Sequence, residues 1–335
     1  MPSPQTPIPS GFGPTTTARE VLRGIDLKGR IAIVTGGSAG LGLETTRALV
    51  EAGATVIVPA RNTDKARHAL SGLPRVEWRH LDLVDPASID AFATWFLATK
   101  RPLHMLINNA GIMATPLQRD ARGYESQFAA NHLGHFQLTV RLWPALRLAG
   151  RQLGGARVVA LSSRGHQRGE VDFADPNFHH RRYDRWQAYG QSKTANVLFA
   201  VELDRLGEAK GVRAFAVHPG AVLTDLSRHM TDEELHAFGL TRADRPGTVP
   251  RGRSVAEGGE FKTQAQGAAT TVWCATSPQL AGRGGVYCQD VDVAPVLSTE
   301  APGNHVGVRA YAIDPKAAAQ LWGLSETLTG LRFEP

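Results

Sequence analysis

The sequence contains very little cysteine and no long apolar run. Only Cys274 and Cys288 occur among 335 residues, so a disulfide framework is excluded and both thiols are expected to be reduced and packed. No CxxC pair or His/Cys cluster is present, and no metal site is predicted. Apolar runs stay below the roughly eighteen residues that a membrane-spanning helix needs, so no membrane span is expected.

Positive charge is in excess but is not concentrated. The net charge of +6 is carried mostly by scattered arginines, which favours anionic ligands. No dense basic run with interleaved aromatic residues occurs, and the densest cluster, residues 179–185, lies in an expected loop, so no nucleic-acid partner is predicted. The start of the chain lacks the basic and apolar regions of a signal peptide, and we expect a cytoplasmic location.

Strand-like and helix-like segments alternate along most of the chain. An apolar content of 42% with 20% charged residues is typical of a globular protein with a sizeable core. Strands joined by crossover helices predict an α/β fold, a single doubly wound parallel sheet of about seven strands with helices on both faces. The expected strands are residues 30–35, 55–58, 76–81, 105–108, 157–161, 212–217 and 285–289.

The chain is expected to have three parts. Residues 1–17, rich in Pro, Ser, Gly and Thr, are predicted to form a flexible N-terminal arm, and a short helix could begin within 17–22. Residues 18–294 form the α/β domain, since no repeat or compositional break marks a second one. Residues 295–335 form a C-terminal extension with a helix that could dock on its own subunit or on a neighbour. Its expected apolar face consists of Ala317, Leu321, Leu324 and Leu328.

A glycine-rich turn follows the first strand and precedes a helical pattern over residues 43–52. Unpaired backbone N–H groups and the positive end of a helix would meet at this turn, where a pyrophosphate can bind. A purely structural turn is the alternative. The turn contains Gly36, Ser38, Gly40, Leu41 and Gly42.

Tyr189 and Lys193 are spaced for one face of a helix, about one turn apart. A phenol with a pKa near 10 is a poor acid at neutral pH, but an ammonium group beside it favours the phenolate and brings proton exchange into range. This pair suits chemistry on a carbonyl or an alcohol. A surface tyrosine with a solvated lysine is the alternative for an isolated YxxxK.

Five motifs occur together in one order: TGGSAGLG at 35–42, NNAG at 108–111, two serines at 162–163, YGQSK at 189–193 and HPG at 218–220. In this order they resemble the short-chain dehydrogenase/reductase superfamily, in its TGxxxGxG branch, over residues 29–293. The segment NHLGHF at 131–136 and the sequence after Tyr189 look like the retinol dehydrogenase, WW-domain oxidoreductase and protochlorophyllide reductase group. The resemblance implies a Rossmann-type fold and a nicotinamide cofactor.

The resemblance also implies a catalytic set of Asn131, Ser163, Tyr189 and Lys193. Ser163 and Tyr189 would bond the substrate oxygen, and Tyr189 would exchange the proton. Lys193 would lower the Tyr189 pKa and hold the ribose hydroxyls. Asn131 would interrupt a long helix over residues 124–148 and hold a water of a proton relay.

Further cofactor contacts are implied at the ends of other strands. Asp82 would meet the adenine amino group, with Leu83 beside it. The amide side chains of the NNAG motif would tie neighbouring strands together. The remaining expected contacts are Asn109, Ala110, Gly111, Pro219, Gly220, Val222 and Thr224.

The end of the second strand bears on which nicotinamide cofactor binds. Ala60 stands where an acidic residue could bind the adenosine ribose, and Arg61 and Asn62 follow it. A missing carboxylate next to an arginine suits a 2′-phosphate, so NADP(H) is predicted over NAD(H). Ser38 replaces the basic residue that some family members carry in the glycine turn, and NAD(H) therefore remains open.

The predicted function is NADP(H)-dependent hydride transfer to or from a carbonyl or alcohol of an apolar small molecule. Residues 164–188 are an expected insertion whose aromatics Phe173, Phe178, Tyr183 and Trp186 would line the substrate entrance, or else pack among themselves. Residues 225–264 are the expected lid. Two alternatives are a reductase of a ring double bond and a non-catalytic NADP(H)-sensing interaction protein. Relatives pair through the helices that hold Asn131 and Tyr189, so a homodimer or homotetramer is plausible.

Overall fold

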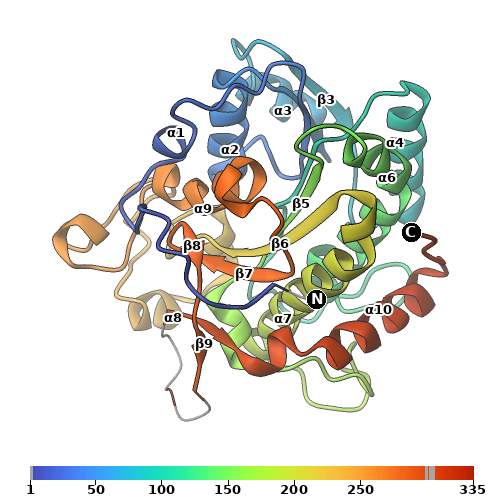
Figure 1. Ribbon diagram of the computed structural model, residues 1–335. Coiled ribbons are helices and arrows are strands. Elements are labelled where there is room, and N and C mark those ends of the chain that lie inside the picture. Colours follow the sequence, from blue (N-terminus) through green and yellow to red (C-terminus); the bar gives the residue numbers. More distant parts are fainter. Residues whose placement is uncertain (1–2, 299–300, 302–305) are drawn as a thin grey trace.

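A mostly parallel sheet runs through the centre of the computed structural model, which describes residues 3–298, 301 and 306–335 (Figure 1). The strand order is β3-β2-β1-β4-β5-β6-β7-β8. All seven predicted strands are present and parallel, and a short eighth strand that the sequence pattern did not indicate pairs antiparallel with β7. The strands are β1 (Ile31–Val34), β2 (Thr55–Ala60), β3 (Val76–His80), β4 (Met105–Asn108), β5 (Ala156–Leu161), β6 (Val212–His218), β7 (Val286–Gln289) and β8 (Asp292–Val293).

Helices cover both faces of the sheet. One face packs against α1 (Ala18–Val21), α2 (Gly40–Glu51), α3 (Thr63–Ala69) and α9 (Gln264–Thr276). The other packs against α4 (Pro86–Ala98), α6 (Gly134–Gly150) and α7 (Arg185–Gly207), and α10 (Pro315–Thr329) packs on the outside of α7. Short α5 (Ser126–Phe128) precedes α6, and α8 (Asp232–Ala237) belongs to the lid. The doubly wound α/β fold expected from the sequence is thus confirmed.

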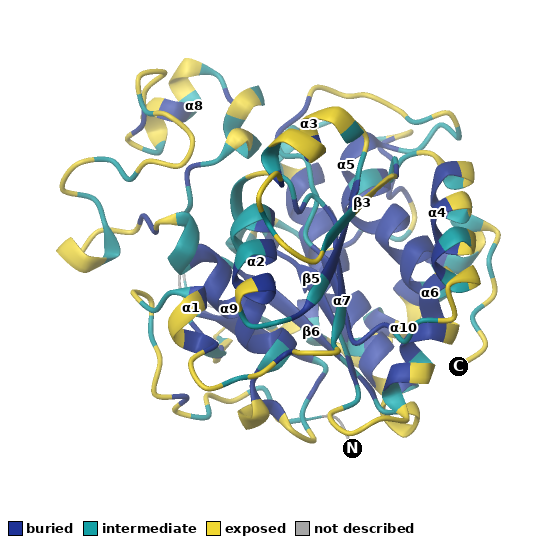
Figure 2. Cartoon of the chain, turned by 90° about the horizontal axis from the view of Figure 1, so that it is seen from above, coloured by how far each residue is buried: buried dark blue, intermediate teal, exposed yellow. Residues whose placement is uncertain are grey.

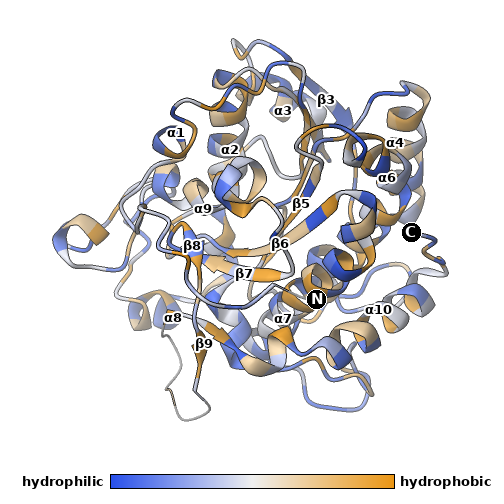
Figure 3. Ribbon diagram, in the orientation of Figure 1, coloured by the Kyte–Doolittle hydropathy of each residue, from blue (hydrophilic) through white to orange (hydrophobic). Residues whose placement is uncertain are grey.

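Burial on both faces explains why the central strands are continuously apolar. All four residues of β4 are buried, and so are six of the seven in β6. Figure 2 shows the buried sheet between exposed outer helix surfaces, and Figure 3 shows β7 as a hydrophobic strand of that sheet. The edge strand β3 is polar and largely exposed, as an edge position permits.

The expected long helix over residues 124–148 is interrupted at Asn131. Between α5 and α6, residues Ala129–Leu133 form one turn of π-helix, η1, before regular helix resumes. A π-turn widens the backbone and leaves a carbonyl without its usual i→i+4 partner. The break that the resemblance implied is therefore present at the expected residue.

The N-terminal arm is held in place, contrary to the expectation of a flexible segment. The Gln5 side chain bonds the backbone of Tyr287 and Ala294, and Ile8 and Ser10 donate their N–H groups to the Asp292 carboxylate. These bonds satisfy backbone groups at the β7–β8 end of the sheet. Composition alone indicated disorder because such distant partners cannot be recognised from the arm's own sequence. The short helix after the arm is confirmed as α1, capped by Thr17.

The C-terminal extension docks on its own subunit. It contains the short strands β9 (Val296–Leu297) and β10 (Val308–Arg309), the 3₁₀ turn η7 (Ala310–Ile313) and helix α10. The Trp322 ring stacks on Phe199 of α7, with centroids 5.8 Å apart, and contacts Phe136 of α6. The expected apolar face is largely confirmed, because Leu321 is buried and Ala317 and Leu328 pack against the same cluster. Further buried residues of α10 are Ala318, Trp322 and Ser325.

No helix among the described residues is long and apolar enough to cross a membrane. The two cysteines are unpaired and buried, as predicted.

Candidate active site

A cleft of about 1170 Å³ lies at the carboxyl ends of the parallel strands. The strand order reverses between β1 and β4, and ligands of doubly wound sheets bind at such a reversal. Every cofactor contact expected from the sequence lines this cleft, as do Ser163, Tyr189 and Lys193, whereas Asn131 lies behind the lining. The expected cofactor contacts that line the cleft are Gly36, Ser38, Gly40, Leu41, Gly42, Arg61, Asn62, Asp82, Leu83, Asn109, Ala110, Gly111, Pro219, Gly220, Val222 and Thr224.

The glycine turn exposes backbone to the cleft. Gly36 and Gly40 have φ of +64° and +51°, which favour glycine, and a Cβ on Gly42 would lie 2.2 Å from the Gly36 carbonyl oxygen. Helix α2 begins at Gly40, and its N-cap, Ala39, offers no side-chain acceptor. The first N–H groups of a twelve-residue helix therefore face the cleft without a side-chain partner. This arrangement fits a pyrophosphate.

The NNAG segment ties β1 to β4, as expected. Asn109 donates its side-chain amide to the Thr35 carbonyl at 2.8 Å, and the Thr35 hydroxyl accepts from the N–H groups of Asn109 and Ala110. A Cβ on Gly111 would lie 3.1 Å from Asn131 Oδ1 and 3.5 Å from Lys193 Nζ. Glycine there keeps the backbone close to the catalytic set.

The side chains expected to be catalytic are brought together by β5 and α7. Tyr189 and Lys193 lie one turn apart on α7, and Lys193 Nζ is 5.6 Å from the Tyr189 ring centroid. Lys193 donates to the Leu161 carbonyl at 3.0 Å, and the Ser162 hydroxyl donates to the Lys193 carbonyl at 2.8 Å. Ser162 therefore anchors α7 to the strand end, and both serines line the cleft.

Burial dominates the protonation of this pair. It raises the pKa of Tyr189 to about 12, with partial opposition from the Ser163 hydroxyl, and it lowers the pKa of Lys193 to about 8. We expected Lys193 to lower the pKa of Tyr189. Instead, burial raises the pKa of Tyr189, and the same burial disfavours the charged form of Lys193. A neutral Tyr189 can donate a proton at pH 7.

Asn131 is locked against the neighbouring loop. Its side chain exchanges two hydrogen bonds with the backbone of Ile112, at 2.8 and 2.9 Å, and donates to the Ser192 hydroxyl at 3.0 Å. His135 Nδ1 lies 3.0 Å from the Asn131 carbonyl oxygen in the widened turn, and His135 Nε2 lies 2.9 Å from the Thr35 hydroxyl. This histidine is buried.

Comparisons with known proteins agree with this geometry. The sequence model of the short chain dehydrogenase family matches residues 30–235. The chain belongs to the short-chain dehydrogenase/reductase family. It is 45% identical to a Streptomyces lividans protein named "Probable oxidoreductase", over 89% of this chain and 97% of that protein. It is 36% identical to human retinol dehydrogenase 12, over 92% and 89% of the two chains. A solved structure of an uncharacterized Mycobacterium paratuberculosis protein is 34% identical and has a TM-score of 0.71. The match covers 96% of this chain and 100% of that protein.

Membership of the short-chain dehydrogenase/reductase family makes the chain an NAD(P)-dependent oxidoreductase, close to the retinol dehydrogenase group. No group of histidine, cysteine or carboxylate residues that could hold a metal ion occurs in the part of the chain that the structure describes.

One wall of the cleft in this dehydrogenase/reductase, next to Tyr189, is apolar. Trp186, from the first turn of α7, lies edge-on to Tyr189 with centroids 6.4 Å apart and packs against Phe238 of the lid. Trp186 also donates its indole N–H to Glu234 of α8, which joins the lid to α7. Sequence reasoning assigned residues 225–264 to the lid but did not single out its apolar lining. Those lining residues are Met230, Phe238, Leu240 and Phe261, facing Met113.

The insertion, residues 164–188, contributes less to the cleft than expected. Trp186 lines the cleft, but Phe173, Phe178 and Tyr183 do not. Phe178 and Tyr183 pack edge to face, and the Tyr183 hydroxyl bonds Glu125 and Gln127. The alternative in which the insertion packs on its own aromatics thus describes its middle part.

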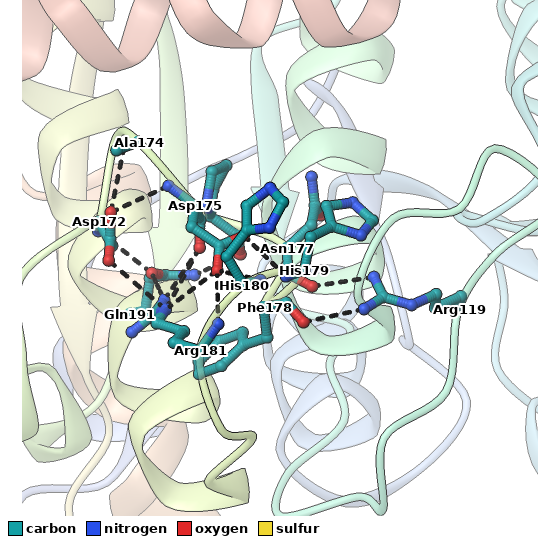
Figure 4. A network of polar contacts seen from close by, with 11 residues as sticks. Arg119, Asp172, Ala174, Asp175, Asn177, Phe178, His179, His180, Arg181 and Gln191 are labelled. Atoms are coloured by element: carbon teal, nitrogen blue, oxygen red, sulfur yellow. Dashed lines mark hydrogen bonds and ion pairs between the residues drawn. The ribbon is translucent and has the colours of Figure 1, made fainter.

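A polar network fixes that middle part (Figure 4). The Asp175 carboxylate accepts the backbone N–H groups of His179, His180 and Arg181, and Arg181 stacks on Phe178 at 3.7 Å. Arg119 donates to the carbonyls of Asn177 and Phe178 from the other side. The aromatics are therefore turned toward the protein, which a sequence pattern without long-range partners could not indicate.

Proposed function

We propose that this enzyme transfers hydride between NADP(H) and a carbonyl or alcohol group of an apolar small molecule, with Tyr189 as general acid and base. The observation that carries the proposal is the convergence of Ser163, Tyr189 and Lys193 at one point of the cleft, between the glycine turn and the apolar wall of Trp186 and Phe238.

In reduction, the Ser163 and Tyr189 hydroxyls would bond the carbonyl oxygen, and Tyr189 would donate its proton as the alcohol forms. The bound nicotinamide would supply the hydride. Lys193 would stabilise the phenolate that remains and bond the ribose hydroxyls, since its ammonium lines the cleft beside Gly111. Asn131 would support reprotonation from its position behind Lys193.

The remaining cofactor contacts are assigned by their places in the cleft. The glycine turn and the N-terminus of α2 would bind the pyrophosphate, and Asp82 with Leu83 would meet the adenine. Thr224, whose methyl group lies against Gly40, would meet the nicotinamide carboxamide together with Pro219, Gly220 and Val222.

A preference for NADP(H) is supported by the cleft at the end of β2. Ala60, Arg61, Asn62 and Lys65 line this part, and no carboxylate stands among them. Two exposed cations there suit a 2′-phosphate. We predict that Arg61→Ala weakens NADPH binding about tenfold, on the order of 1.4 kcal/mol, and leaves NADH binding unchanged. Arg67→Ala is the matched control, because Arg67 pairs with Asp64 on the same helix and does not line the cleft. Equal losses for both cofactors would contradict the assignment.

The first experiment is to follow NADPH oxidation against aldehydes, ketones, quinones, a steroid and a retinoid. Turnover of any carbonyl compound supports the proposal. Reduction confined to a ring double bond would favour a protochlorophyllide reductase-like activity, and tight NADPH binding without any turnover would favour a cofactor-sensing protein.

The packing of α10 bears on assembly. Because Trp322 and its neighbours cover the outer face of α7, we propose that any homodimer or homotetramer forms through another surface. Two buried, unpaired cysteines are compatible with a reducing cytoplasm, which we propose as the location.

A further inference from the structure

The turn that follows the catalytic serine is held by the C-terminal extension. Residues Arg164–Arg168 form a 3₁₀ turn, η2, directly after Ser163. The backbone N–H of Arg309 in β10 donates to His166 Nε2 at 3.2 Å, and the Tyr311 hydroxyl donates to the His166 carbonyl at 2.7 Å. Gln167 Nε2 also donates to the Gly307 carbonyl. A segment far away in the sequence therefore bonds both the side chain and the backbone of η2.

His166 links this segment to Ser163. Its Nδ1 lies 2.7 Å from the Ser163 carbonyl oxygen, and its own backbone N–H donates to the same oxygen at 3.0 Å. Since Nε2 accepts from a backbone N–H, Nδ1 must carry the proton and the ring must be neutral. Burial supports this state, because it lowers the pKa of His166 to about 4. The ring packs on Tyr287, with centroids 4.9 Å apart.

The turn η2 also packs closely against Tyr189, the proposed general acid. The Gly165 N–H donates to the Ser163 hydroxyl oxygen at 2.9 Å, and a Cβ on Gly165 would lie 2.7 Å from the Tyr189 ring. Thr194, next to Lys193 on α7, donates its hydroxyl to the carbonyls of His166 and Gly169. A shift of η2 would therefore move the Ser163 hydroxyl relative to Tyr189.

We propose that His166, clamped by Arg309 and Tyr311 of the C-terminal extension, is a positioning residue that sets the Ser163 hydroxyl against Tyr189. His166 does not line the cleft and is completely buried, so it can act only through its neighbours, and its ring bonds the Ser163 carbonyl. The proposal rests on the proposed function, in which Ser163 bonds the substrate oxygen. Misplacement of a reacting group by about 1 Å can cost on the order of 100-fold in rate.

The test is a double-mutant cycle on the full chain, with NADPH and the best carbonyl substrate. His166→Phe keeps a ring against Tyr287 but removes both ring nitrogens. We expect kcat to fall about tenfold to 100-fold, with the Kd for NADPH changed less than about twofold. In a Ser163→Ala background the same substitution should cost less than about threefold, because the group that it positions is already gone. Losses that multiply across the two backgrounds would overturn the proposal.

Tyr311→Phe is a second test, because it removes only the hydroxyl that bonds the His166 carbonyl. It tests the positioning role even if the His166→Phe variant does not fold. We expect a severalfold loss of kcat that again disappears in the Ser163→Ala background. Tyr124→Phe is the matched control, since its hydroxyl donates to the Leu328 carbonyl at 2.9 Å on the same extension but away from η2. Equal effects of Tyr311→Phe and Tyr124→Phe would overturn the positioning role. If Ser163→Ala alone left turnover intact, the proposed function itself would fail, and the inference with it.

Discussion

The floor of the active site and its lid are built in different ways. Tyr189, Lys193 and Asn131 are at most 4% exposed. The first two lie on α7, which packs against the central sheet, and Asn131 lies in η1, which packs against α7. The lid, residues 225–264, contains only α8 and two short 3₁₀ turns, and it stands out from the body of the protein (Figure 2). Its own apolar cluster is small and contains Met230, Leu235, Leu240 and Phe261, and an exposed ion pair joins Arg242 to Asp232.

This difference suggests that the chemistry depends on the floor and the substrate selectivity on the lid, so that the two can vary independently. A change in the floor disturbs buried groups that are desolvated and hydrogen bonded, and such changes are costly. Pairs of exposed charges contribute about 0–1 kcal/mol, so a change to an exposed charge of the lid should leave both folding and proton transfer nearly intact. The same chemistry can therefore serve a different substrate when lid residues change.

The largest effect is expected in the floor, from Tyr189→Phe. Removal of the phenolic hydroxyl removes the proton donor, and general acid catalysis contributes about 10²–10⁴-fold. We expect kcat to fall by that factor, while NADPH affinity measured by fluorescence titration stays within about twofold. A variant that keeps half of its activity would show that another group donates the proton.

The floor was also the part that could be predicted from the sequence. Tyr189 and Lys193 are neighbours on one helix, and the glycine turn is continuous in the chain, so local spacing places them correctly. The seven parallel strands followed from apolar runs of strand length. Asn131 was found through the family resemblance and because a helix interior is an unfavourable place for asparagine.

Features that depend on distant partners were predicted less well. The insertion aromatics were expected either at the cleft or packed among themselves, and Phe173, Phe178 and Tyr183 do not line the cleft. Gln5 and its partners on β7 are about 280 residues apart, and no local pattern indicates that contact. His166 carried no signal of its own, since its role depends on Arg309 and Tyr311.

A second prediction concerns stability and returns to the buried floor. Burial lowers the pKa of His132 to about 3, of His135 and His166 to about 4, and of His218 well below its usual value. The unfolded chain, with histidine pKa values near 6.5, therefore binds more protons than the folded protein between about pH 6.5 and 4. Stability is fully present above about pH 6.5 and falls as the pH drops through that window.

Each histidine should contribute on the order of 1 kcal/mol to the difference between pH 7.5 and pH 5.5. Urea unfolding at the two pH values measures it. His132→Gln should reduce the difference by about one histidine's share, even though it removes the bond to Ser325 and lowers stability at pH 7.5. The same free energy of unfolding at both pH values would contradict the burial argument.

The smallest effect is expected in the lid, from Glu260→Gln. Glu260 lines the cleft and joins Arg164, next to Ser163, to Arg253, which donates to the carbonyls of Phe238 and Gly239. Its side chain is 41% exposed, so its pairs are weak, and we expect KM to rise about threefold with kcat within about twofold.

Glu257→Gln is the control for that substitution, because Glu257 caps a lid turn through Ser254 and does not line the cleft. If Glu260→Gln raises KM alone, the lid selects the substrate without taking part in proton transfer. A tenfold loss of kcat would mean that the pair with Arg164 helps to hold Ser163, since Arg164 begins the turn that follows the serine. Glu260 would then belong functionally to the floor rather than to the lid. The turn η2 would be held by Glu260 on one side and by the C-terminal extension on the other.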